Sequence, residues 1–442
     1  MPANPSRSLR CLVALAAALG FLAAPAGAED EAPEVVAPAD LPLNVDVELA
    51  DLEEIEKQRK VIQARDRIGQ RVSRYLERAG ELAEQEQTEE AKALLEKIQE
   101  SRLNGFEKAY VLRLMGFVAY GASQPEQAID YFGQAVATES LPLRDENTLR
   151  YGIGQLYVGT GSWVEAIYAF KDWLRYSENP DPTGYFVQAI AYFQLKKFDT
   201  AIAHVQKALE VAPKPQESWL KLLAALYAEK QEFKNAVPVL EELLVRFPSK
   251  TYWTQLALIN AATESYDVSL AVQQIAYEQG YVSEQRELLR LAQGYVFHGL
   301  PYPAAKLIER ELESGRLESS AEHHEMLANS WIGAREYDKA LPPLHKAAKL
   351  ADTGTFYVRL GQVHMQREEW SEAVDFLRKA IAKADLEEKQ GSAQVLLGIA
   401  LYNAGELVGA QSSFAQASRY ERNRAEAERW LEHIGKELAQ GA

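Results

Sequence analysis

The chain has 442 residues, of which 47% are hydrophobic and 25% are charged, so its composition excludes wholesale disorder. The 48 Lys and Arg residues and 64 Asp and Glu residues give a formal net charge of −16. This charge disfavours nucleic acid as the main ligand, because neutralising a phosphate backbone requires clustered cations. A single cysteine excludes a disulfide framework, a two-thiol redox site and a cysteine-based zinc site.

The N-terminal residues have the three parts of a secretory signal. Arg7 and Arg10 form the positive start, residues 11–24 are apolar, and small residues at 26–28 offer a cleavage site. The apolar run is short for a membrane-spanning helix, which is the alternative interpretation. Cleavage would also remove the only cysteine, which suits an oxidising compartment. We therefore expect residues 1–28 to be a signal peptide and the mature protein to be exported.

The segment after the signal, residues 29–48, is predicted to be an acidic, proline-containing tether. Eleven carboxylates and no Lys or Arg lie between residues 29 and 56, and three prolines break any early helix. The acidic run either keeps the protein soluble or acts as an electrostatic docking arm for a basic partner. Apolar residues at helical spacing begin near Leu49.

A repeating unit fills the sequence from about residue 72 to residue 420. Each unit has a small residue that is followed twelve positions later by a second small residue, and successive units begin 33 to 38 residues apart. The first small positions are Ala79, Gly116, Gly154, Ala189, Ala224, Ala257, Ala292, Ala328, Gly361 and Gly398. The second small positions are Ala91, Ala128, Ala166, Ala201, Ala236, Ser269, Ala304, Ala340, Ala373 and Ala410. A third position, seven residues further on, is Ala in six units.

The spacing predicts two helices per unit, joined by a short turn such as the one at residues 159–163. Two helices pack closely only where Gly or Ala lies at their crossing, and aromatic side chains fill the flanking gaps. One hairpin cannot bury both of its faces, so the units must stack. The first unit and the sixth, in which Ser269 replaces Ala, fit the pattern least well. Residues 421–442 are predicted to form a capping helix and tail.

The period of about 34 residues, with these small and aromatic positions, resembles the tetratricopeptide repeat. The resemblance implies an all-α, right-handed superhelical solenoid of about ten hairpins over residues 49–420, with a C-terminal capping helix. It also implies a concave groove, lined by the first helix of each hairpin, that binds peptide segments of protein partners. By carry-over of repeat positions, the groove candidates are Tyr110, Arg113, Phe117, Tyr120, Thr148, Tyr151, Gln155, Phe186, Ile190 and Phe193. The alternative is that several of these side chains pack between neighbouring hairpins.

Motifs for catalysis, cofactors or metals are not found. The Gly152–Gly154 pair lacks the third glycine of a dinucleotide loop, and neither a P-loop nor a nucleophile elbow occurs. His323 and His324 are adjacent, so on a helix they point about 100° apart and do not share one ion. His364 stands where other units have an aromatic residue, which favours a packed core position. We expect no enzymatic activity, no cofactor and no metal site; an enzyme with its site in the groove is the alternative from another class.

The sequences of residues 217–259, 288–318 and 327–348 resemble periplasmic tetratricopeptide proteins described as components of TonB systems in Gram-negative bacteria. In such systems an ExbB–ExbD motor energises TonB, which pulls on outer-membrane nutrient receptors. The resemblance implies a periplasmic, non-catalytic scaffold that binds TonB or ExbB/ExbD components. Removal of Arg7 and Arg10 with the signal takes the net charge to −18, which would attract the Pro- and Lys-rich segment of a TonB-type protein. The alternative is a scaffold for another envelope assembly or export machine.

Overall fold

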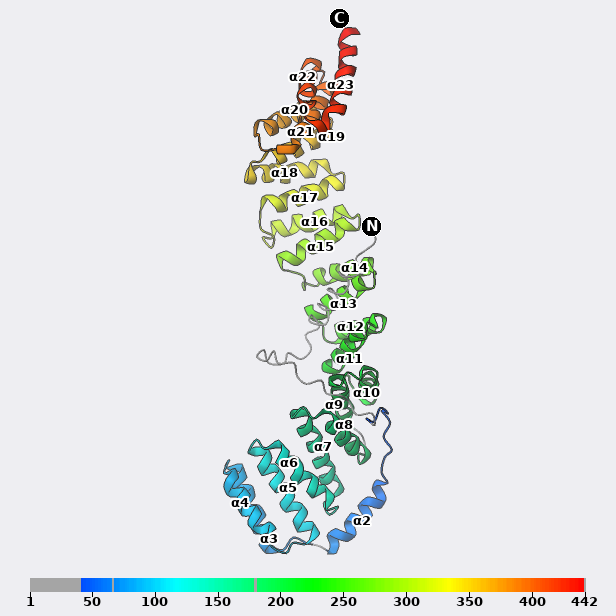
Figure 1. Cartoon of the computed structure of the whole chain (residues 1–442), viewed down its shortest axis with the longest axis vertical. Coiled ribbons are helices and arrows are strands. Elements are labelled where there is room, and N and C mark those ends of the chain that lie inside the picture. The colour runs from blue at the N-terminus through cyan, green and yellow to red at the C-terminus, as the bar shows by residue number, and fades with distance from the viewer. Residues whose placement is uncertain (1–40, 66, 179–180, 441–442) are drawn as a thin grey trace. The chain divides into compact units, whose positions relative to one another are not determined.

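The computed structural model describes residues 41–65, 67–178 and 181–440 (Figure 1). The predicted signal peptide and residues 29–40 of the predicted tether lie outside the described residues. The regular structure of the described residues is entirely helical, which confirms the predicted all-α fold class. The chain divides into two compact units, Met1–Pro248 and Ser249–Ala442, and each is described by itself.

Unit 1 contains an isolated helix followed by five helical hairpins. The isolated helix is α2 (Leu52–Arg65). The hairpin helices are α3 (Gln70–Glu84), α4 (Thr88–Gln99), α5 (Gly105–Gly121), α6 (Pro125–Ala137), α7 (Leu143–Gly159), α8 (Trp163–Arg175), α9 (Pro182–Gln194), α10 (Phe198–Val211), α11 (Glu217–Glu229) and α12 (Phe233–Arg246).

Unit 2 contains five further hairpins and a final helix. Its helices are α13 (Lys250–Ala262), α14 (Tyr266–Glu278), α15 (Gln285–Phe297), α16 (Pro301–Glu313), α17 (Ala321–Gly333), α18 (Tyr337–Ala351), α19 (Gly354–Gln366), α20 (Trp370–Ala382), α21 (Gln390–Asn403), α22 (Leu407–Ala417) and α23 (Glu421–Gln440). A single 3₁₀ turn, η1 (Glu387–Lys389), precedes α21.

Each hairpin packs internally and against the next hairpin of its unit, as the repeat pattern predicts. The predicted turn at residues 159–163 is present: α7 ends at Gly159, α8 begins at Trp163, and Gly161 has a φ of +74°. Glycine adopts this left-handed conformation without a Cβ clash, so the chain reverses within three residues. Pro213 and Pro248 follow the ends of α10 and α12, where they stop the second helix of a hairpin.

Small residues lie at the helix crossings of each hairpin. Ala79, like most of the alanines at the first and second small positions, is fully or almost fully buried. At the glycines the helices approach even more closely, since a Cβ built on Gly116 would lie 2.4 Å from a ring carbon of Phe132. A Cβ built on Gly398 would likewise lie 2.7 Å from the ring of Phe414. Three of the four glycines at the first small position face a phenylalanine ring in this way, and the fourth, Gly361, faces Leu377.

The final helix α23 closes the last hairpin. Its Trp430 stacks on Phe414 of α22 with ring centroids 5.3 Å apart and planes 4° apart. Ala427 and Ile434 are fully buried on the same face. The outer face of α23 is mostly exposed and charged, which is what a solenoid end requires for solubility.

Candidate partner-binding clefts

Four of the predicted groove residues lie along one side of α5. The Arg113 Nη1 atom donates to Asp145 Oδ2 of α7 at 3.1 Å, which joins the first helices of two neighbouring hairpins. The Arg113 guanidinium also lies 5.7 Å from the ring centre of Tyr110 and 5.8 Å from that of Phe117. Phe117 is 45% exposed and Tyr120 is 62% exposed. The structure therefore brings Tyr110, Arg113 and Phe117 into one cluster. The rings of Phe117 and Tyr120 are open to solvent.

The predicted residues on α9 are packed more closely against neighbouring rings. Phe186 is half-buried, with its ring centre 5.8 Å from that of Trp219 on α11. Phe193 is also half-buried and lies 5.9 Å from Phe198 of its own hairpin. Ile190, between them on α9, is half-buried too. Phe186 thus contacts the next hairpin, and Phe193 contacts the second helix of its own hairpin.

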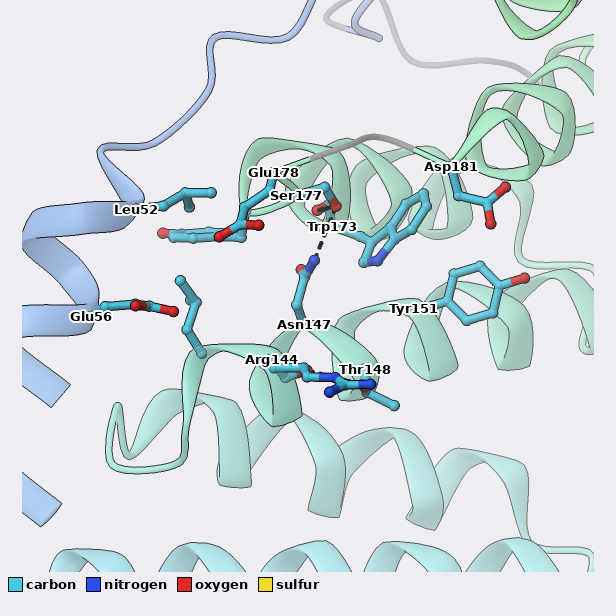
Figure 2. Close-up of a pocket in the computed structure, with 12 residues that line it drawn as sticks. Leu52, Glu56, Arg144, Asn147, Thr148, Tyr151, Trp173, Ser177, Glu178 and Asp181 are labelled. Atoms are coloured by element: carbon cyan, nitrogen blue, oxygen red, sulfur yellow. Dashed lines mark hydrogen bonds between the residues drawn. The ribbon is translucent and has the colours of Figure 1, made fainter. Parts of the chain in front are cut away.

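Two of the three predicted residues on α7, Thr148 and Tyr151, line a cleft of about 660 Å3 (Figure 2). Tyr151 is half-buried, and its hydroxyl oxygen accepts a hydrogen bond from Gln155 Nε2 at 2.7 Å. Its ring lies 5.1 Å from that of Trp173 on α8, and the two rings form an aromatic floor. Thr148 is exposed one turn before Tyr151, and its hydroxyl donates to the Arg144 carbonyl at 2.9 Å. Tyr151 and Thr148 thus reach a concave site, whereas Gln155 supports the Tyr151 hydroxyl.

Trp173 is a residue that the sequence analysis missed. It occupies the third repeat position, which is Ala in six other units. The space for its indole comes from Gly184 on α9, where an added Cβ would lie 2.0 Å from the Trp173 ring. The departure from Ala was visible in the sequence, but the compensating glycine eleven residues later became recognisable only from the packing.

The rim of this cleft is mainly acidic. Glu178 and Asp181 lie on either side of Trp173, and Glu56 extends from α2 toward the cleft (Figure 2). Within the described residues, neither Glu178 nor Asp181 forms an ion pair, and Arg144 is the one cation that lines the cleft. These carboxylates leave a local excess of negative charge beside two aromatic rings, which suits a cationic side chain.

One wall of the cleft belongs to α2, which packs on α7 through a buried ion cluster. Glu146 of α7 is fully buried, and its Oε2 accepts from Arg59 Nη2 of α2 at 3.0 Å. Arg150 Nη1 lies 3.6 Å from the same oxygen, and Arg150 Nε donates to Asp172 at 2.8 Å. Burial raises the pKa of the Glu146 carboxyl, and the two arginines oppose this shift only in part. The cluster therefore ties an isolated helix to the hairpin array through charge.

The chain before α2 is also attached to the array. The Ala50 amide donates to the Arg175 carbonyl at the end of α8 at 2.8 Å. The Tyr192 hydroxyl of α9 donates to the Pro42 carbonyl, and Leu41 is 5% exposed. Residues 41–50 are non-helical and lie against α8 and α9.

A second cleft, of about 630 Å3, lies between α15 and α17 in unit 2. Phe297 at its edge is 80% exposed, and Val296 beside it is 50% exposed. Glu322 and Glu325 of α17 line the other side, and Glu325 is paired with Arg359 Nη2 at 3.5 Å. This cleft is more apolar than the one in unit 1 but also has an acidic edge.

The histidines are packed or hydrogen-bonded. His323 Nδ1 lies 2.7 Å from the Glu318 carbonyl, and His324 Nε2 lies 2.8 Å from Ser319 Oγ. His364 is 8% exposed and stacks on Phe376 with ring centres 5.1 Å apart, which confirms its predicted core position. Across residues 41–65, 67–178 and 181–440, no group of three or more His, Cys, Asp or Glu side chains is placed to hold a metal ion.

None of the helices in the described part of the chain is both long and apolar enough to cross a membrane. Residues 114–182, 186–249 and 325–388 match the family model described as tetratricopeptide repeat. No curated protein matches the chain.

Solved structures with a similar chain path include a tetratricopeptide repeat protein from Parabacteroides merdae, which is 18% identical over 55% of this chain and 94% of that chain, with a TM-score of 0.34. MamA from Desulfovibrio magneticus RS-1, from residue 41 to its end, is 24% identical over 39% of this chain and 96% of that chain, with a TM-score of 0.30. The TPR2AB domain of yeast Sti1, in a complex with pHSP90, is 17% identical over 59% of this chain and 99% of that chain, with a TM-score of 0.32. These TM-scores are all below 0.5, so the similarities bear on neither partner nor function.

Proposed function

This chain is a tetratricopeptide-repeat protein, and we propose that it works in the periplasm as a non-catalytic scaffold of a TonB–ExbB–ExbD system. In this proposal its hairpin array binds a protein segment and organises components that energise outer-membrane nutrient uptake. The bound segment is the Pro- and Lys-rich part of a TonB-type protein.

The cleft on α7 is the observation that carries the proposal. Its floor is the Tyr151–Trp173 pair, and its rim holds Glu178 and Asp181. Proline-rich segments adopt an extended helix that docks on aromatic-lined grooves. Lysine side chains between the prolines meet the carboxylates of the rim, and an ammonium group is also attracted to the aromatic faces. A Pro- and Lys-rich segment therefore fits both features of the cleft.

The charge of the whole chain supports the same class of partner. The net charge is −16, and it becomes −18 in a chain that has lost Arg7 and Arg10 with the proposed signal. A long-range field of this sign accelerates the association of a basic segment, and salt weakens the effect because it screens the charges. The proposed periplasmic location rests on the signal-like N-terminal sequence.

The test is a binding measurement between the purified mature protein and the periplasmic segment of TonB from the same organism. We expect binding that weakens as salt is raised, and we expect Tyr151→Ala to lower the affinity by about tenfold. The double change Glu178→Gln and Asp181→Asn should reduce the salt dependence. Tyr266→Ala is the matched control, because Tyr266 is 49% exposed on α14 and lines none of the clefts described above.

A deletion strain gives the second readout. Loss of the protein should reduce TonB-dependent uptake, and the Tyr151→Ala variant should restore less uptake than the Tyr266→Ala variant. Absence of TonB binding at low salt, together with normal uptake in the deletion strain, would contradict the TonB role. It would leave the binding of another protein segment by the same cleft open to test with components of other envelope machines.

A further inference from the structure

The sixth hairpin breaks the apolar pattern of the repeat inside its core. Sixteen residues after the first small position, the other units bury an apolar side chain that is at most 4% exposed. These residues are Leu95, Phe132, Phe170, Val205, Leu240, Ile308, Leu344, Leu377 and Phe414. The sixth unit, formed by α13 and α14, has Gln273 at this position, and Gln273 is partly exposed. The same unit has Ser269 at the second small position.

The two polar residues of this unit form a connected hydrogen-bond group. Gln273 Nε2 donates to the Ser269 carbonyl at 3.3 Å and to Ser269 Oγ at 3.4 Å. Ser269 Oγ in turn donates to the Ala257 carbonyl of α13 at 2.8 Å. The side chains of Gln273 and Ser269 are therefore both hydrogen-bonded, and replacing apolar residues with them leaves neither side chain without a partner.

A cleft of about 240 Å3 opens beside these residues, between α13, α14 and α15. Trp253 and Tyr281 contribute two rings, with centres 6.3 Å apart and planes inclined by 37°. Leu258 and Leu291 add apolar surface. The volume is below the roughly 300–1,000 Å3 of sites for drug-sized ligands, so the cleft suits a single large side chain.

At this cleft one cation, Arg290, can receive a negative partner group, while Glu287 also lines the cleft and is paired with Lys250. Trp253 Nε1 is buried and, within the described residues, has no hydrogen-bond acceptor. Arg290 is exposed at the cleft and forms no ion pair with another described residue. Lys250 is already neutralised, since its Nζ lies 2.7 Å from Glu284 and 2.8 Å from Glu287. The remaining unneutralised cation at the mouth is Arg290, and an acceptor is also missing for the indole N–H.

We propose that this sixth-unit cleft binds an aromatic side chain of a protein partner that is followed directly by a carboxylate residue. The aromatic ring enters between Trp253 and Leu291, and the carboxylate pairs with Arg290 at the mouth. Arg290 gives this site the opposite charge preference to the acidic cleft on α7. The inference goes beyond the proposed function, because it names a second site for a different segment.

Gln273 is the residue that keeps the cleft open. A leucine at this position, as in four other units, would bury its methyl groups against α13 and occupy the space that the amide leaves. Gln273→Leu should therefore raise the midpoint of thermal unfolding by a few degrees while it abolishes binding. A site without function would show only the gain in stability.

The test uses a capped hexapeptide, Gly-Gly-Phe-Asp-Gly-Gly, and calorimetric titration of the purified mature protein. We expect binding with a Kd on the order of 1 mM or tighter. Peptides with Phe-Asn or Ala-Asp at the central positions should each bind about tenfold more weakly, since one loses the charge and the other the ring. Arg290→Ala should remove the preference for Phe-Asp over Phe-Asn, and Arg286→Ala, an exposed arginine outside the cleft, should preserve it.

Three outcomes would overturn the inference. These are no binding of the Phe-Asp peptide at millimolar concentration, equal binding of the three peptides, and unchanged binding by the Gln273→Leu variant. The Tyr151→Ala variant should bind the hexapeptide normally. A failure here with normal TonB binding rejects the sixth-unit cleft alone, and the reverse result rejects the proposed function alone.

Discussion

Each unit of the molecule contains a fully buried glutamate, and the two are neutralised in different ways. In unit 2, Glu311 of α16 receives Arg316 Nη2 on Oε1 at 2.8 Å and Arg316 Nε on Oε2 at 2.5 Å. The Tyr277 hydroxyl of α14 also donates to Oε1 at 2.5 Å. In unit 1, Glu146 uses Oε2 for both Arg59 and Arg150, and its Oε1 has no partner among the described residues.

The difference lies in where the partners come from. Arg316 is five residues from Glu311, and Tyr277 belongs to the preceding hairpin, so that cluster forms whenever the hairpins stack. Arg59 lies 87 residues before Glu146, on α2, which is outside the hairpin array. The Glu146 carboxylate takes a counter-ion, Arg59, from a separate helix. The docking of α2 is therefore coupled to the charge of Glu146. Since α2 is one wall of the α7 cleft, the cluster in unit 1 attaches that wall to the array, whereas the cluster in unit 2 joins helices of two neighbouring hairpins.

The largest expected effect on stability follows from removing Arg316, which binds both carboxylate oxygens of Glu311 in unit 2. Arg316→Ala leaves the buried Glu311 carboxylate without its main counter-ion, which should lower the free energy of unfolding of unit 2 by about 3–5 kcal/mol. Hydrogen exchange of the α16 and α17 amides measures this locally. Arg310→Ala is the control, because Arg310 is largely exposed and lies 3.9 Å from Glu311. Equal protection in the two variants would show that the cluster does not support packing.

Arg59→Ala should have a smaller effect on unit 1, about 1–3 kcal/mol, because α2 can detach and allow water to reach Glu146. Faster hydrogen exchange should appear in α2 and in residues 41–50, while α9 to α12 keep their protection. Lys60→Ala, an exposed neighbour on the same helix, serves as the control. If exchange also increases throughout α9 to α12, the cluster supports the array and not only the docking of α2.

The fold could be predicted from the sequence because small residues recur at fixed spacing, and this spacing alone demands stacked hairpins. The side-chain clusters around Trp173, Glu311 and Glu146 could not be predicted from the sequence. Trp173 and Glu311 both replace Ala at the third repeat position, so the sequence marks them as departures. Their consequences depend on Gly184 and on Arg316 with Tyr277, whose proximity only the packing reveals. The tie between Arg59 and Glu146 has no sequence signal, because no repeat spacing relates α2 to α7.

The expected effect of Tyr277 is moderate and depends on pH, and it concerns only the cluster in unit 2. Burial, with the hydrogen bond to Glu311 and its negative charge, raises the pKa of Tyr277 to about 12 from an ordinary value of 10.0. The unfolded chain therefore loses this proton at a lower pH than the folded chain does. Between pH 10 and about 12 the folded state binds more protons, so the stability of unit 2 should fall as pH rises. Tyr277→Phe should remove this slope from unfolding curves measured over that range, and an unchanged slope would assign it to other groups.

The smallest expected effect is the titration of Glu146 in unit 1. Burial is the main cause that raises the pKa of this carboxyl above its ordinary value of 4.5, so the folded chain takes up this proton at a higher pH than the unfolded chain does. Above pH 4.5, stability should therefore fall as pH rises through the folded pKa, and it should recover on acidification.

The measurement compares thermal unfolding of the native protein with that of Glu146→Gln, whose side chain stays neutral. The difference between the two proteins should narrow as pH falls from neutrality toward 4.5, and Glu241→Gln, at an exposed position on α12, is the control. Because burial under the docked α2 raises this pKa, protonation favours the docked state, so the protection of the α2 amides in the native protein should increase over the same interval. A constant difference between the native protein and Glu146→Gln would mean that Arg59 and Arg150 hold the carboxylate ionised throughout. In that case the docking of α2 would not change with pH over this interval, and Glu56 of α2 would keep the same place at the α7 cleft throughout.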